Sequence, residues 1–132
     1  MSEAKKKLLV VDDEKEFADL LKKRLEINGY EVVTAHDGQE GLEKVKAEKP
    51  DLIILDLMLP KIDGYKVCGL LKRDNRFRHI PIILFTARAQ EADIKLGQEV
   101  GAEAYLTKPY VSETLLAEIR RLLPTTTQPI SG

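Results

Sequence analysis

Residues 52–56 read Leu-Ile-Ile-Leu-Asp, a continuous apolar run that ends in a carboxylate. A short strand that is apolar at every position is typical of a parallel sheet covered on both faces, because neither face of the strand meets water. Two further runs, Leu8–Val11 and Ile82–Phe85, have the same character. These three segments predict the buried centre of a parallel β-sheet.

Strand-like runs alternate with amphipathic segments along the whole chain. Five such strand–helix units predict an α/β three-layer sandwich built from right-handed crossovers. The predicted strands are Leu8–Val11, Val32–Thr34, Leu52–Leu55, Ile82–Phe85 and Tyr105–Leu106, and the predicted helices cover 14–28, 38–48, 64–74, 89–100 and 112–123.

Helix ends and helix faces follow from local signals. Glycine after a helical segment is a common C-terminal stop, so Gly29 and Gly101 are expected just beyond two of the helices. Apolar residues at i, i+3 and i+4 predict the buried face of a helix. On this basis the buried faces are predicted from Phe17, Leu20 and Leu21 in 14–28, and from Val67, Leu70 and Leu71 in 64–74.

Length and composition restrict the function classes. The 132 residues are 43% hydrophobic and 33% charged, with 21 basic and 22 acidic side chains and a net charge of −1. This describes one globular domain without the basic excess of a nucleic-acid binder. The single cysteine, Cys68, predicts no disulfide and is expected to be a small buried hydrophobe. No signal peptide or membrane span is evident, so we expect a cytoplasmic protein without membrane contact.

Polar residues follow four of the five predicted strands. Asp12 and Asp13 follow the first, Asp56 the third, Thr86 the fourth and Lys108 the fifth. Each one alone has an ordinary explanation: Asp13 suits a helix N-cap, a threonine after a strand suits a turn, and a lysine is usually solvated. Ligands of open parallel sheets bind beyond the carboxyl ends of the strands. The combination therefore predicts a site at that edge.

The residue types predict the chemistry of this site. Three carboxylates in one place repel one another unless a cation joins them. Oxygen ligands without histidine or cysteine favour a hard ion, so Mg²⁺ is expected, with Mn²⁺ as a substitute. An added ammonium and hydroxyl complement a phosphoryl group. The residues alone therefore predict Mg²⁺-assisted phosphoryl transfer with a carboxylate as candidate nucleophile.

These motifs closely resemble the receiver domain of bacterial two-component response regulators, the CheY-like family. The resemblance rests on Asp12-Asp13, on Leu-Asp-Leu-Met-Leu-Pro-Lys-Ile-Asp-Gly at 55–64, on Thr86-Ala87 and on Tyr-Leu-Thr-Lys-Pro at 105–109. It covers about residues 6–123. It implies the flavodoxin-like fold, a five-stranded parallel sheet in the order 2-1-3-4-5, which is the order of CheY, the stand-alone member of this family.

The resemblance also assigns roles. Asp56 would be the phosphoacceptor, and Asp13 and Asp56 would bind Mg²⁺ with the backbone carbonyl of Met58, while Asp12 would act mostly through metal-bound water. The remaining assigned residues are Lys108, pairing with a phosphoryl oxygen, Thr86, hydrogen-bonding another, and Tyr105, turning inward as Thr86 moves.

The expected partners follow from the same resemblance. A sensor histidine kinase or a phosphotransfer protein would donate the phosphoryl group. The output would be a protein target or a missing output domain, read through the face of the fourth helix, fifth strand and fifth helix, with Lys95, Tyr105 and Arg120 as candidates. Leu96 and Glu103-Ala104 depart from DNA-binding members of the family, so a monomer or a weak dimer is expected, and the near-neutral net charge predicts no direct nucleic-acid contact.

Domain boundaries and alternatives complete these expectations. Residues 1–123 are predicted to form the receiver, and the Thr/Pro-rich 124–132 to be a flexible tail or the start of a linker. The main function is a signalling switch with limited self-phosphorylation and self-dephosphorylation. One alternative is a Mg²⁺-dependent phosphatase, which the absence of a second aspartate two residues after Asp56 disfavours. Another is a pseudo-receiver, which the complete set of site residues disfavours.

Overall fold

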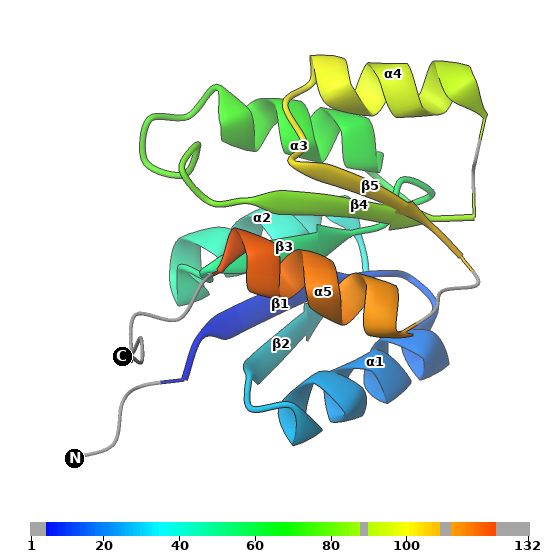
Figure 1. Cartoon of the computed structure of the whole chain (residues 1–132). Coiled ribbons are helices and arrows are strands. Elements are labelled where there is room, and N and C mark those ends of the chain that lie inside the picture. Colours follow the sequence, from blue (N-terminus) through cyan, green and yellow to red (C-terminus); the bar gives the residue numbers. More distant parts are fainter. Residues whose placement is uncertain (1–4, 88–89, 109–111, 124–132) are drawn as a thin grey trace, which may run out of the picture.

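The protein, seen here as a computed structural model, is described over residues 5–87, 90–108 and 112–123, where strands and helices alternate (Figure 1). In chain order the elements are β1 (Lys7–Val11), α1 (Lys15–Ile27), β2 (Glu31–Ala35), α2 (Gly38–Glu48), β3 (Leu52–Leu55), α3 (Gly64–Lys72), β4 (Ile82–Thr86), α4 (Glu91–Glu99), β5 (Ala104–Thr107) and α5 (Ser112–Leu122). The predicted elements are confirmed, with ends that shift by up to two residues.

The five strands form one parallel sheet in the order β2-β1-β3-β4-β5, which confirms the predicted topology. Strand β1 lies at the switch point, with β2 on one side and β3 on the other. The register pairs Val11 with Ala35 and with Leu55, so β1, β2 and β3 end at the same level. In Figure 1 the strands point from left to right, so their carboxyl ends lie on the same side of the sheet.

Two apolar layers cover the sheet because alternate strand residues face opposite sides. One layer joins the sheet to α2 and α3 through side chains such as Val45, Val67 and Leu71. The other joins it to α1 and α5 through side chains such as Leu21 and Ile119. The central strands β3 and β4 are buried at every position, as their continuous apolar sequences predict.

The helix stops were predicted correctly, whereas part of the predicted helix faces was wrong. Gly29 and Gly101 take positive φ angles of 97° and 96°, which glycine adopts without steric penalty. Leu20 and Leu70, however, are 54% and 42% exposed. Their neighbours Leu21 and Leu71 take the buried positions, because the two apolar layers accept only one narrow stripe from each helix.

Cys68 is fully buried between α3 and the sheet, which confirms its prediction as a small hydrophobe. Burial raises the pKa of its thiol to about 12. Among the described residues no helix is long and apolar enough to cross a membrane. The predicted tail at 124–132 lies outside the described residues.

Candidate phosphoacceptor and metal site

The three predicted aspartates meet at the carboxyl ends of β1 and β3. Asp12 and Asp56 directly follow these neighbouring strands and are 3% and 5% exposed, whereas Asp13 is exposed. Their backbones continue the sheet pairing, since the Asp12 amide donates to the Ala35 carbonyl at 3.0 Å and the Asp56 amide to the Val11 carbonyl at 3.0 Å. One carboxylate oxygen from each aspartate lies within 4.8 Å of the others.

Asp12 holds the turn into α1. Its Oδ1 accepts a hydrogen bond from the Glu14 amide at 2.9 Å, and its Oδ2 accepts one from Lys108 Nζ at 2.7 Å. The N-cap position of α1 is Glu14, and no side-chain hydrogen bond caps it. The interpretation of Asp13 as an N-cap is therefore wrong, because the turn places its side chain beside Asp56 instead of over the helix amides.

Asp56 sits where the chain turns sharply from β3 toward α3. Its Oδ1 accepts a hydrogen bond from the Met58 amide at 3.1 Å, and its Oδ2 contacts Lys108 Nζ at 3.2 Å. Helix α3 begins at Gly64, whose Cα faces the backbone oxygen of Asp56 so closely that a Cβ there would overlap it. Glycine at this position therefore lets α3 start next to the phosphoacceptor candidate.

Lys108 brings one ammonium to this carboxylate group. Its amide donates to the Thr86 carbonyl at 2.7 Å, which continues the β4–β5 pairing to the edge of the site. Its Nζ contacts Asp12, Asp56 and Glu14, the last at 3.3 Å, and only 12% of the side chain is exposed. Lys108 is thus a site residue and not a solvated lysine, while Pro109 and Tyr110 lie outside the described residues.

Thr86 ends β4 and is fully buried. Its Oγ1 has no hydrogen-bond partner among the described residues. Leaving a buried hydroxyl unpaired costs about 1–3 kcal/mol, so folded proteins seldom do it without a functional reason. A ligand oxygen placed at the site edge would satisfy this hydroxyl.

Burial and neighbouring charges act in opposite directions on the pKa values of Asp12 and Lys108. Burial raises the pKa of the Asp12 carboxyl above its ordinary value, although the hydrogen bond from Lys108 opposes the rise. Burial lowers the pKa of Lys108, but its contacts with Asp12 and Asp56 outweigh burial and raise the pKa overall. Lys108 is therefore a permanent cation at neutral pH, next to more negative charge than it neutralises.

The remaining negative charge fits a hard metal ion. Asp12, Asp13 and Asp56 offer only oxygen donors, and within the described part of the chain no histidine or cysteine side chain belongs to the cluster. Such a donor set suits Mg²⁺ better than zinc. Next to the cluster an open hollow of about 500 Å³ is lined by Asp13 and the β3–α3 loop, including Met58. This hollow opens the acidic group to solvent.

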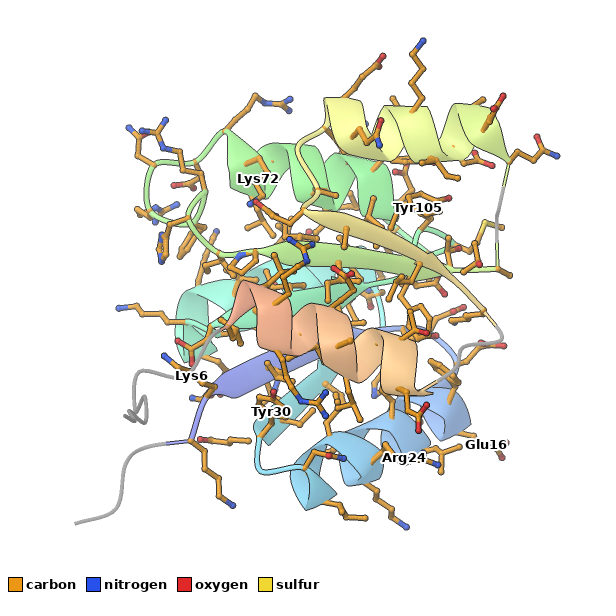
Figure 2. All side chains as sticks on the ribbon, in the orientation of Figure 1. Lys6, Glu16, Arg24, Tyr30, Lys72 and Tyr105 are labelled. Atoms are coloured by element: carbon orange, nitrogen blue, oxygen red, sulfur yellow. The ribbon has the colours of Figure 1, made fainter. Side chains whose placement is uncertain are left out.

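The predicted output residues lie on α4, β5 and α5. Lys95 is exposed on α4, and Tyr105 on β5 packs beneath α4, where a Cβ on Gly97 would lie 2.9 Å from its ring (Figure 2). Arg120 is exposed on α5 but lies near Tyr30, since its charge opposes the burial that raises the pKa of the Tyr30 phenol. Arg120 therefore also borders the β2 side of the molecule.

Sequence reasoning missed two neighbours of Lys108 and one of Asp12. Glu14 contacts the Lys108 ammonium. The centroid of the Phe17 ring, a residue predicted only as part of the core, lies 4.4 Å from Lys108 Nζ. His36 Nδ1 is 3.1 Å from the Asp12 backbone oxygen. The third consecutive acid in Asp-Asp-Glu was the available signal for Glu14, and the place of His36 at the end of the second predicted strand was the signal for His36, whereas Phe17 carried none.

A parallel 2-1-3-4-5 sheet with carboxylates at its switch point defines an α/β protein of the CheY-like type. The sequence matches the family described as response regulator receiver domain over residues 8–120, and the chain belongs to this family. Receiver domains generally bind Mg²⁺ at an acidic pocket, which is here the cluster of Asp12, Asp13 and Asp56.

Known relatives agree with this membership. The chain is 48% identical over 118 residues to the alkaline phosphatase synthesis transcriptional regulatory protein PhoP of Bacillus subtilis, covering 89% of this chain and 48% of PhoP. It is 45% identical over 117 residues to the DNA-binding dual master transcriptional regulator RpaA of Synechocystis, covering 89% and 48%. The chain thus spans about half the length of these curated relatives.

A solved structure agrees on the fold. A putative response regulator from Chloroflexus aurantiacus superposes with a TM-score of 0.87 at 34% identity, covering 92% of this chain and all of that one. The relatives are response regulators, which are signalling switches, and none of these comparisons indicates an enzyme family.

Proposed function

We propose that residues 1–123 form a receiver that accepts a phosphoryl group on Asp56 and changes conformation to control a partner. The observation that carries this proposal is a group of three carboxylates with only one ammonium, that of Lys108, beside it. Next to this group lies the buried hydroxyl of Thr86, which has no hydrogen-bond partner among the described residues. A phosphoryl group supplies what this arrangement lacks, because its oxygens accept hydrogen bonds from both Lys108 and Thr86.

The transfer reaction follows from these positions. A phosphohistidine of a sensor kinase or phosphotransfer protein brings its phosphorus to an Asp56 oxygen. The P–N bond breaks as the new O–P bond forms, and the imidazole leaves with the bonding electron pair and takes a proton from solvent. Lys108, already within 3.2 Å of Asp56, stabilises the charge on the phosphoryl oxygens.

The bound cation belongs to the same proposal. Asp12, Asp13 and Asp56 would hold Mg²⁺, with Mn²⁺ as a substitute and with help from the Met58 carbonyl. When bound, the ion neutralises carboxylate and phosphoryl charge. The chain itself contributes the fixed carboxylates and excludes water around Asp12 and Asp56 through their burial.

The conformational output begins at Thr86. Its hydroxyl is buried beside the site edge, so a hydrogen bond to a phosphoryl oxygen draws it toward Asp56. Tyr105, whose ring packs between α4 and the sheet, then moves into the space that Thr86 leaves. The change is read on α4, β5 and α5, where exposed Lys95 and Arg120 and half-buried Tyr105 are the proposed contact residues.

The wider role is also a proposal. Relatives named as transcriptional regulators are about twice as long as the match, so this receiver is proposed to control a downstream protein or output module. A net charge of −1 supports an output through protein contact instead of direct nucleic-acid binding. Residues 124–132 would connect the two parts or form a free tail. The receiver would act as a monomer or a weak dimer.

The proposed switch turns over only slowly. A small phosphodonor such as acetyl phosphate would also transfer its phosphoryl group to Asp56, and water would later remove it. The adduct would therefore accumulate, unlike the transient intermediate of a phosphatase.

The test is phosphorylation with acetyl phosphate. The protein is incubated with Mg²⁺, and intact mass and hydroxylamine sensitivity of the adduct are recorded. We expect one phosphoryl group per chain, absent from Asp56→Asn and present in Asp19→Asn, which changes an exposed aspartate of α1. Equal labelling of Asp56→Asn, or no labelling of the Mg²⁺-loaded wild type, would overturn the proposal. Steady turnover without an adduct would indicate a phosphatase.

A further inference from the structure

The surroundings of the Lys108 ammonium include one group that carries no charge. The ring of Phe17, in the first turn of α1, lies with its centroid 4.4 Å from Nζ. An ammonium over an aromatic face is attracted by the electron density of the ring, most strongly where water is excluded. With 12% of the Lys108 side chain exposed, this contact is largely shielded from solvent.

The Phe17 ring is itself packed against a second aromatic ring of the core. Phe17 packs on Phe85 with a centroid distance of 5.9 Å and an interplanar angle of 49°. Phe85 is 2% exposed, belongs to β4 and directly precedes Thr86. The Phe17 ring, carried by α1, is therefore packed against a buried side chain of the sheet.

The carboxylates and the ring act differently on the ammonium. Nζ contacts Asp12 at 2.7 Å, Asp56 at 3.2 Å and Glu14 at 3.3 Å. During phosphoryl transfer these partners must change, because Asp56 becomes neutralised by its new bond and phosphoryl oxygens compete for the N–H donors. The ring accepts no conventional hydrogen bond and changes no charge, so its attraction persists throughout the reaction.

We propose that Phe17 is a positioning residue for phosphoryl transfer, which holds the Lys108 ammonium over the reaction site while its hydrogen-bond partners change. This inference rests on the proposed function of Asp56 and adds a residue to it. Phe17 acts through Lys108, whose Nζ lies 4.4 Å from the centroid of its ring. Its loss widens the range of positions of Nζ and slows transfer without removing it.

The first test is the substitution Phe17→Leu, which keeps an apolar side chain against Phe85 but removes the aromatic face. The rate of adduct formation with acetyl phosphate and Mg²⁺ is expected to fall about threefold to tenfold, the range for one partly shielded cation–π contact. Incorporation of pentafluorophenylalanine at position 17 keeps the ring and reverses its face potential, and should slow the reaction to a similar extent. Phe17→Tyr, which retains an electron-rich ring, should react at about the wild-type rate.

A matched control separates positioning from packing. Phe77 is buried near the opposite end of the sheet, and its ring lies 4.8 Å from the Arg76 guanidinium carbon. Phe77→Leu therefore removes a ring and a cation contact of the same kind away from the site. It is expected to lower stability but to leave the phosphorylation rate within about twofold of wild type.

A second measurement does not depend on phosphorylation. The Lys108 Cε protons next to Nζ should show an upfield ring-current shift in the NMR spectrum of the unphosphorylated protein, and Phe17→Leu should abolish it. If both Phe17→Leu and the fluorinated protein phosphorylate at the wild-type rate, Phe17 is only a packing residue and the inference is wrong. If the ring-current shift is absent, the inference is also wrong, even when Asp56 is phosphorylated as proposed. Absence of labelling with the shift present contradicts the proposed function instead.

Discussion

Lys72 and Lys108 are equally buried, with 12% of each side chain exposed, but their surroundings differ. Lys72, on α3 near the start of β4 (Figure 2), donates to the carbonyls of Arg78 and Ile80 and to Glu103 at 3.1, 2.8 and 2.8 Å. One ammonium there meets one carboxylate. Its other partners are neutral carbonyls, so its charge and its donors are satisfied within the chain.

Lys108 meets three carboxylates instead, from Asp12, Asp56 and Glu14. The local charge remains negative, and the neighbouring Thr86 hydroxyl lacks a partner in the described ranges of the chain. Burial is therefore the same at both lysines, while the balance of charge and hydrogen bonds separates them. Lys72 connects α3, its following loop and Glu103, which itself accepts from the Ile82 amide at 2.8 Å. Around Lys108, by contrast, carboxylate charge and a hydroxyl remain that could interact with a ligand.

The largest expected contrast concerns the reaction rate. Replacing Lys108 by methionine removes the cation that is proposed to face the phosphoryl oxygens, and loss of one such group slows catalysis about 10²–10³-fold. Lys72→Met should change the rate by less than about threefold. Initial rates of adduct formation with acetyl phosphate measure both. Similar slowing in the two variants would show that the lysines do not differ in function.

The contacts of Lys72 should show in the stability of the fold. Lys72→Met leaves the carbonyls of Arg78 and Ile80 and the exposed Glu103 without their shared donor, and loss of these hydrogen bonds costs about 1–3 kcal/mol. Urea unfolding measures this loss, and Mg²⁺ should not restore it. Lys66→Met, at an exposed position of the same helix, is the control and should remain within about 0.5 kcal/mol of wild type. A wild-type midpoint for Lys72→Met would show that its contacts contribute little.

Mg²⁺ should stabilise the folded protein by binding near Lys108, at the carboxyl ends of the strands, and not near Lys72. An ion at 100 times its Kd stabilises the folded state by about 2.7 kcal/mol if it does not bind the unfolded chain. Thermal or urea unfolding with and without Mg²⁺ tests this, and EDTA should reverse the gain. Asp13→Asn should reduce the gain strongly, whereas Asp19→Asn should retain it. An equal gain in both variants would place the ion elsewhere.

The smallest effect concerns Cys68, one helical turn before Lys72. Burial raises the pKa of its thiol to about 12 from 9.0, and the Lys72 charge opposes the rise. Above pH 9 the unfolded chain loses the thiol proton while the folded chain keeps it, so folding becomes less stable as pH rises. By pH 10 this contribution is about 1.4 kcal/mol.

The stability difference between wild type and Cys68→Ala isolates that contribution, because other titrating groups are common to both proteins. Urea unfolding at pH 8 and pH 10 should show wild type losing more stability than Cys68→Ala. A pH-independent difference would mean that the thiol ionises as readily in the folded protein as in the unfolded chain.

Local sequence signals predicted the elements and the principal site residues because these signals act over short distances. Continuous apolar runs identified β1, β3 and β4, and Gly29 identified the end of α1. Strand direction then brought Asp12 and Asp56 to one edge. Helix orientation was less accessible, as exposed Leu20 shows, since spacing alone permits two neighbouring leucines to face the core.

Contacts between distant segments carried no comparable signal. Lys108 lies 96 residues from Asp12, and Lys72 lies 31 residues from Glu103. The sequence placed Lys108 after the last strand, but nothing in it showed that Lys108 meets three carboxylates whereas Lys72 meets one. The ring of Phe17 beneath Lys108 likewise depends on the angle at which α1 crosses the sheet.

The sequence by itself determined the strand and helix order, the polar residues at the strand ends and the resemblance to receiver domains, because backbone preferences and apolar periodicity act locally. Only the tertiary structure decided which side chains share a charge environment. Electrostatic and hydrogen-bond interactions fall off within a few ångströms in space, whatever the separation along the chain. That is why the contacts of Lys108 with Glu14 and with the Phe17 ring became known only from the folded structure.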